Sequence, residues 1–69
     1  MKKQPTLAER IKSLREKAGL SQRALAAEAG ISQPAVGMIE SGRRTLPQAD
    51  TLARIARALG TTSEKLLGM

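Results

Sequence analysis

The sequence has 69 residues, contains no cysteine, histidine or aromatic residue, and carries twelve lysines and arginines against six acidic residues. A chain of this length forms one domain with a small aliphatic core, which excludes a deep catalytic pocket. The missing cysteines and histidines exclude disulfides, thiolate metal sites and the commonest general base, whereas the net charge of +6 favours a polyanionic partner such as nucleic acid.

The charge alone fits a merely soluble basic protein equally well, and the apolar residues form no segment long enough to span a membrane. No apolar run approaches the roughly 20 residues that a bilayer requires. Met1-Lys2-Lys3 is similar to the start of a signal peptide, but Glu9, Arg10 and Lys12 interrupt the region where its apolar segment would follow. Because the absence of cysteine fits a reducing compartment, we expect a cytoplasmic protein without a membrane partner.

Start and stop signals predict five helices and no strand. Each expected helix has apolar residues at helical spacing and is bounded by a capping residue, a glycine or a polar turn. In chain order, the expected helices are about 7–18, about 22–29, a third opened by Ser32 or Gln33 and closed by Ser41-Gly42, a fourth over 49–59, and a short last helix that ends at Leu67. Thr6-Leu7-Ala8-Glu9 and Thr61-Thr62-Ser63-Glu64 have the spacing of capping boxes for the first and last helices.

The second and third expected helices are joined only by Gly30-Ile31-Ser32. So short a connection with a glycine is typical of a helix-turn-helix. Gly30 can adopt a positive φ after the end of a helix, and Ile31 beside it can turn into the core. We therefore expect a helix-turn-helix over about residues 22–41.

The third expected helix has an uncharged outer face. Its inward positions are Val36 and Ile39, and its outward positions are Gln33, Pro34, Gly37 and Met38. Gln33 can pair with adenine N6 and N7, Met38 can contact a thymine methyl group, and Gly37 lets the helix backbone approach a groove closely. The alternatives are a solvated glutamine, a methionine that is simply exposed or packs on a neighbouring protein, and a glycine tolerated at a cost of about 1 kcal/mol.

Pro34 and the charges around this helix add further expectations. Pro34 suits a first helical turn and disfavours helical angles at Gln33, so the helix can effectively begin at Pro34 and aim Gln33 outward. Arg43-Arg44 directly follows the helix and can bind phosphates or reach the minor groove; the alternative is a solvated charge pair. Glu40 lies in the last helical turn, where the helix dipole disfavours an anion, so we expect a cation to compensate it.

The chain resembles the helix-turn-helix domain of the phage repressor and Cro family, often called Xre-type, over residues 10–67. The residues that carry the resemblance are Arg15, Gly19-Leu20-Ser21-Gln22, Leu25-Ala26, Gly30-Ile31-Ser32, Ile39-Glu40, Gly42, Pro47, Leu52, Ile55-Ala56, Ala58-Leu59-Gly60 and Leu66-Leu67. The resemblance implies an all-α fold, a compact five-helix bundle of the lambda-repressor-like type. Residues 1–6 would be an N-terminal arm, 7–67 the domain and 68–69 a tail.

The resemblance also implies roles for individual positions. Gln22 matches the phosphate-binding glutamine at the start of the second helix, and Gln33 matches the base-reading glutamine of the third. Pro34 and Met38 stand where several relatives carry polar base-reading groups, which predicts more apolar and shape readout here. The resemblance pairs Glu40 with Arg15 as a structural ion pair that can be bidentate; the alternative is two unrelated surface charges.

The candidate site is therefore an interface with DNA. Base readout is expected from Gln33, Pro34, Gly37 and Met38. Phosphate contacts are expected from Ser21, Gln22, Ala35, Arg43 and Arg44, with Arg10, Arg23 and Lys17 as weaker candidates. No catalytic residue, metal or cofactor is expected.

The leading expectation is a sequence-specific regulator of the repressor type that binds a double-stranded DNA operator as a homodimer. One helix reads only a few base pairs, so specificity requires two half-sites about 34–36 Å apart. The alternative is an antitoxin, or another protein-binding module of a toxin–antitoxin pair. Scattered carboxylates disfavour an enzyme, and the absence of aromatic side chains disfavours RNA binding. Because the last helix stops abruptly at Gly68-Met69, a missing C-terminal domain is a further candidate partner.

Overall fold

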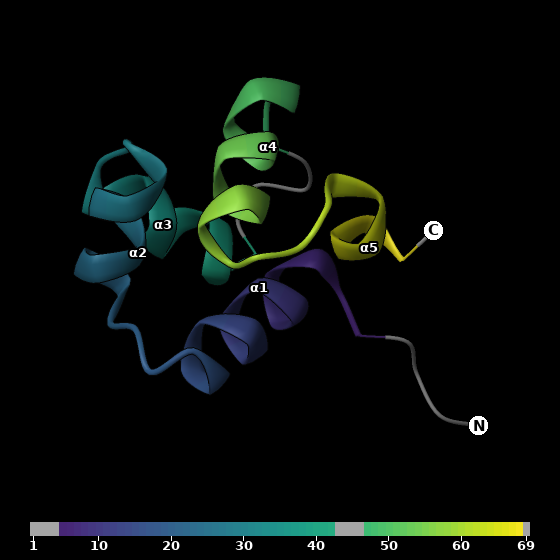
Figure 1. The fold of residues 1–69 in the computed structure, drawn as a ribbon, viewed down its shortest axis with the longest axis horizontal. Helices are drawn as coiled ribbons and strands as arrows, with labels where there is room; N and C mark the ends of the chain where they lie inside the picture. Colours follow the sequence, from purple (N-terminus) through teal and green to yellow (C-terminus); the bar gives the residue numbers. More distant parts are fainter. Residues whose placement is uncertain (1–4, 43–46, 69) are drawn as a thin grey trace.

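The computed structural model describes residues 5–42 and 47–68, and within these ranges the chain has helices, turns and no strand. The five helices are α1 (Leu7–Lys17), α2 (Gln22–Ala29), α3 (Gln33–Glu40), α4 (Ala49–Ala58) and α5 (Ser63–Leu67). In Figure 1, α2 and α3 lie together at one end of the molecule and α5 lies at the other. The expected all-α, five-helix fold is confirmed.

The core is aliphatic and receives one fully buried side chain from each helix. These side chains are Ile11, Leu25, Val36, Ile55 and Leu66. Burying a side chain of this size stabilises the fold by about 1.5–3 kcal/mol. Because all five helices contribute to one cluster, α2 and α3 are held against the rest of the domain and do not form a separate hairpin.

The caps of the first and last helices differ from each other. Thr6 and Glu9 form the expected capping box, since the Thr6 N–H donates to Glu9 Oε1 at 2.8 Å and the Glu9 N–H donates to Thr6 Oγ1 at 3.1 Å. The expected capping box at residues 61–64 is wrong, because Thr62 caps α5 and accepts from the Lys65 N–H at 3.2 Å. The Thr61 N–H donates to Ala56 O at 2.9 Å in the turn after α4, and a capping box at Thr61 would need this N–H for the Glu64 side chain.

Two helices end one residue earlier than expected. Ala18 and Leu59, expected as the last residues of the first and fourth helices, are C-caps with ψ near zero, −5° for Ala18 and 0° for Leu59. Each precedes a glycine with positive φ, 73° at Gly19 and 71° at Gly60. The chain therefore leaves helical geometry one residue before the glycine. None of the described helices combines the length and the apolar character needed to cross a bilayer.

Candidate nucleic-acid interface

The turn between α2 and α3 holds the two helices in a fixed relation. Gly30 lies in the left-handed region at φ 70°. The Ile31 N–H donates to Ala26 O at 2.9 Å, which satisfies a carbonyl at the end of α2. Ile31 packs against the core, as the sequence predicted. These bonds and this packing fix how α3 is presented to the outside.

The start of α3 differs by one residue from the expectation. The helix begins at Gln33 and not at Pro34, with Ser32 as its cap and Pro34 in its first turn. The Ser32 Oγ accepts from the Ala35 N–H at 3.2 Å. A capped first turn allows Gln33 to take helical angles despite the proline that follows. Gln33 is exposed at the tip of the helix all the same.

The outer face of α3 is uncharged and open, whereas its inner face is buried. Val36 and Ile39 are in the core. Pro34 is exposed, and Met38 keeps 44% of its surface accessible. Pro34 and Met38 line a hollow of about 250 Å³ that has Thr51 of α4 on its other side. The helix therefore presents a polar tip and an apolar flank, a surface suited to base edges and methyl groups in a DNA groove.

A buried ion pair joins α1 to the end of α3. Arg15 Nε donates to Glu40 Oε2 at 2.7 Å and Arg15 Nη2 donates to Glu40 Oε1 at 3.1 Å. Only 11% of the Arg15 side chain and 4% of the Glu40 side chain are exposed. The bond to Glu40 raises the pKa of Arg15 above its ordinary value, so the guanidinium stays charged. The structure thus contains the pair implied by the sequence resemblance, and it is bidentate.

Two further hydrogen bonds extend this pair into a polar network. Arg15 Nη1 donates to the carbonyl oxygen of Leu20 at 2.8 Å, in the turn before α2. Gln22 Nε2 donates to Glu40 Oε1 at 3.2 Å. The network links α1, the start of α2 and the end of α3. The family resemblance implied the ion pair, but nothing in the sequence predicted the bond from Gln22, since no spacing rule relates residues 22 and 40.

Gly37 lies where the Gln22 side chain reaches α3. A Cβ added at Gly37 would meet Gln22 Oε1 at 3.7 Å, which is an ordinary van der Waals contact. The packing of α2 against α3 therefore does not require a glycine at this position. The functional interpretation of Gly37 is that a residue without a side chain lets the α3 backbone approach a DNA groove closely.

Apart from Arg10, the expected phosphate-contacting residues fall into three groups. Ser21 and Gln22 lie at the start of α2, where the Ser21 Oγ accepts from the Ala24 N–H at 3.0 Å and keeps its own O–H as a donor, and Arg23 is exposed next to them. The N–H of Ala35 is engaged by Ser32 Oγ. Arg43 and Arg44 lie outside the described residues.

Arg10 contacts the end of α5, which the sequence did not indicate. Its Nη1 donates to the carbonyl oxygen of Leu66 at 3.4 Å, and a Cβ on Gly68 would collide with its guanidinium. A cation at this end of α5 also suits the helix dipole. The structure therefore places Arg10 in the contact between α1 and α5, and it does not bring Arg10 together with the outer face of α3.

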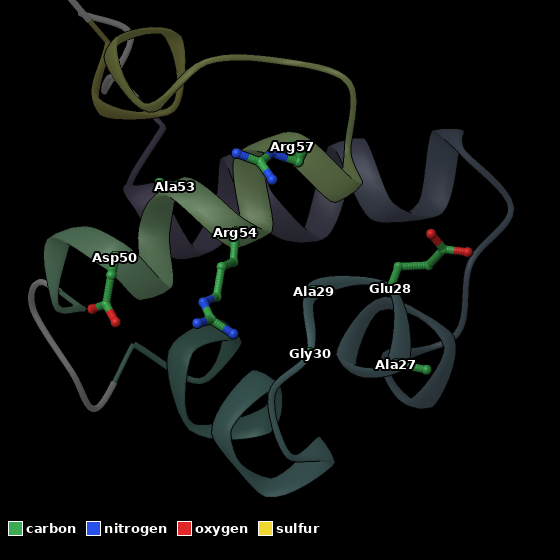
Figure 2. A pocket seen from close by; sticks show the side chains of 8 residues that line it. All are labelled: Ala27, Glu28, Ala29, Gly30, Asp50, Ala53, Arg54 and Arg57. Carbon is green, nitrogen blue, oxygen red and sulfur yellow. The ribbon is translucent and has the colours of Figure 1, made fainter.

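A second hollow was not anticipated from the sequence and lies between the end of α2 and α4. It has a volume of about 460 Å³. Figure 2 shows that Arg54 extends from α4 toward Gly30, while Asp50 lies one turn earlier on α4. Its four charged residues are Glu28, Asp50, Arg54 and Arg57, and their formal charges cancel. The lining of this hollow therefore has no net positive charge with which to attract a phosphate backbone.

Comparisons with known proteins agree with this geometry. Residues 11–66 match a protein family described as helix-turn-helix. The uncharacterised HTH-type transcriptional regulators Rv0474 and MT0491, from two strains of Mycobacterium tuberculosis, are each 45% identical over 56 residues, which cover 81% of this chain and 39% of theirs. The chain thus spans about two fifths of the length of these curated relatives.

Solved structures show the same fold. SinR, in a crystal structure with DNA, has a TM-score of 0.86 and 29% identity, and the match covers 90% of this chain and 98% of that one. The P22 c2 repressor, crystallised with a synthetic operator, has a TM-score of 0.86 and 28% identity, covering 93% of this chain and 96% of that one.

Proposed function

Because the chain belongs to the helix-turn-helix family, we propose that it is the DNA-binding domain of a transcriptional regulator of the repressor type, and that α3 reads bases in the major groove. The observation that carries this proposal is the uncharged outer face of α3. It presents Gln33, Pro34 and Met38 outward from a turn that the core holds in place. A DNA-binding role further supports a cytoplasmic location.

The size of α3 supports a dimeric mode of binding. Eight residues at 1.5 Å each make a helix about 12 Å long, which spans about three or four base pairs at about 3.4 Å each when it lies in the major groove. Such a short site is not selective, so we propose that two copies bind half-sites about 34–36 Å apart. The domain is 36 Å along its longest axis, so neighbouring copies at this spacing can touch.

The distribution of charge supports phosphate contacts next to α3. Four of the twelve basic residues, Lys2, Lys3, Arg43 and Arg44, lie in the segments 1–4 and 43–46. The described ranges contain the other eight basic residues and all six acidic residues, so they are close to neutral. Most of the excess positive charge is thus carried by the N-terminal segment and by the segment after α3. We propose that Arg43 and Arg44, in the segment after α3, contact phosphates or the minor groove.

Replacing Arg43 with alanine should weaken DNA binding uniformly across sequences. Loss of one phosphate contact should reduce the slope of log affinity against log salt by about one. Fluorescence anisotropy over a salt series measures this slope. Arg57→Ala is the matched control, since it removes the same charge from the hollow beside α4 and should leave the slope nearly unchanged. Equal slopes for the Arg43 variant and the wild type would contradict the phosphate role.

Replacing Gly37 with alanine should raise the melting temperature and lower the affinity for DNA. Alanine favours a helix interior by about 1 kcal/mol, and its methyl group meets only Gln22 Oε1 in ordinary contact, so the melting temperature should rise. Affinity for DNA should fall several-fold, because the methyl group keeps the α3 backbone away from the groove. Gly30→Ala, at φ 70°, is the contrasting variant and should lower the melting temperature. A more stable Gly37 variant with undiminished affinity would exclude close approach at this position.

The proposed function is tested by selection from a random duplex library at about 150 mM salt. A palindromic motif with half-sites about one helical turn apart would support a dimeric operator-binding regulator. Enrichment of no sequence, with binding that disappears as salt rises, would contradict it and favour the alternative of a protein-binding module.

We also propose that the chain has no catalytic activity of its own. The sequence lacks histidine and cysteine, which removes the commonest general base and the thiolate nucleophile. In the ranges 5–42 and 47–68, no three Asp or Glu side chains are grouped closely enough to hold a metal ion.

A further inference from the structure

We propose that Glu40 is a positioning residue, which orients the side-chain amide of Gln22 for contact with a DNA phosphate. The inference rests on the proposed function, because it assumes that the start of α2 faces the DNA backbone. Its basis is the hydrogen bond from Gln22 Nε2 to Glu40 Oε1 at 3.2 Å. Glu40 therefore binds Gln22 in addition to forming the ion pair with Arg15.

The chemistry of the two groups determines which way the amide faces. An ionised carboxylate only accepts hydrogen bonds, so the amide must turn its nitrogen toward Glu40. The reverse orientation would place the amide oxygen against a carboxylate oxygen. Glu40 cannot move to relieve such a contact, because two hydrogen bonds hold it to Arg15, which is itself held by Leu20 O.

The fixed amide lies at a place suited to a phosphate. Gln22 is the first residue of α2, where the backbone N–H groups and the helix dipole favour an anion. Its Oε1 lies beside Gly37, on the partly exposed side of α3. One N–H of Nε2 is engaged by Glu40, and the other can donate to a phosphate oxygen at the edge of the groove that α3 would enter. Glu40 lowers the conformational entropy lost on binding, because the amide is oriented before DNA arrives.

The orientation is testable in the free wild-type protein. In an NMR spectrum of the 69-residue chain, a Gln22 side-chain proton bonded to a carboxylate should resonate downfield and exchange slowly with water. Gln33 and Gln48 are internal controls, because both are exposed. A Gln22 resonance indistinguishable from these two would overturn the inference. This measurement needs neither DNA nor a variant that risks unfolding.

The effect on binding is testable with a double-mutant cycle on a mixed-sequence duplex at low salt, since phosphate contacts do not depend on sequence. Glu40→Gln should weaken binding by about tenfold in the wild type and by less than twofold in a Gln22→Ala background. Affinities are compared at a temperature where circular dichroism shows every variant to be folded. Glu28→Gln controls for net charge: like Glu40→Gln it removes one negative charge, here from an exposed residue, and it should leave affinity unchanged or slightly increased.

The outcomes separate this inference from the proposed function. An equal loss for Glu40→Gln in both backgrounds would show that Glu40 acts only on the fold, and it would overturn the inference while DNA binding stands. A Gln22→Ala variant with wild-type affinity would overturn it as well. A chain that binds no duplex at any salt would overturn the proposed function, whatever the NMR spectrum of Gln22 shows.

Discussion

Glu40→Ala should lower the free energy of unfolding by about 3–5 kcal/mol, because it leaves the buried Arg15 guanidinium without its partner. The Arg15 side chain is only 11% exposed, so water cannot replace the two lost hydrogen bonds. A domain of this size has a core that commonly supplies no more than about 3–5 kcal/mol of net stability. We therefore expect the variant to be largely unfolded at room temperature, as measured by circular dichroism during heating and in urea.

A double variant distinguishes the cost of an orphaned charge from the net contribution of the pair. Arg15→Met combined with Glu40→Leu removes both charges and keeps similar volumes, so it should recover most of the lost stability. Such recovery would show that the pair itself adds little net stability and that the cost of Glu40→Ala comes from the orphaned Arg15 charge. A melting temperature for Glu40→Ala equal to that of the wild type would contradict the structural role of the pair.

Gln33→Ala should lower affinity for the selected operator by about 1–3 kcal/mol and relax selectivity at one base position. The reason is the loss of the proposed bidentate pair between the Gln33 amide and adenine N6 and N7. Stability should stay unchanged, because the Gln33 side chain is exposed at the tip of α3. Repeating the library selection with the variant shows which position loses its preference.

A matched control exists on α4. Gln48 is also an exposed glutamine at the start of a helix, and its side chain makes no capping bond. Gln48→Ala should leave the selected motif unchanged at every position. If Gln33→Ala weakened binding to all sequences equally, Gln33 would be a phosphate contact and not a base-reading residue.

The helices and their order follow from local signals in the sequence. Thr6, Ser21 and Ser32 each cap the helix that follows, and Gly30 takes the positive φ that the short turn requires. Aliphatic residues at helical spacing identified the buried faces, including Val36 and Ile39 of α3. These features are predictable because a cap, a turn or an amphipathic face depends on residues within about four positions of each other.

The pairing of Arg15 with Glu40 was implied by family resemblance and not by any local rule. Its two residues lie on different helices, and a sequence pattern alone would have left two unrelated surface charges equally acceptable. In the structure, Arg15 Nε lies 2.7 Å from Glu40 Oε2, and both side chains are buried. The family resemblance thus implied a long-range contact that composition and spacing do not predict.

Only the tertiary structure decided the contacts between helices that no local signal describes. Thr61 is used by the end of α4, so Thr62 caps α5. Arg10 is bound to the end of α5, and Gln22 is bound to Glu40. The sequence by itself determined the helices, their buried faces and the turn that joins α2 to α3. It could not determine these side-chain partners, because a long polar side chain reaches several acceptors and its choice depends on which helix ends the packed core places nearby.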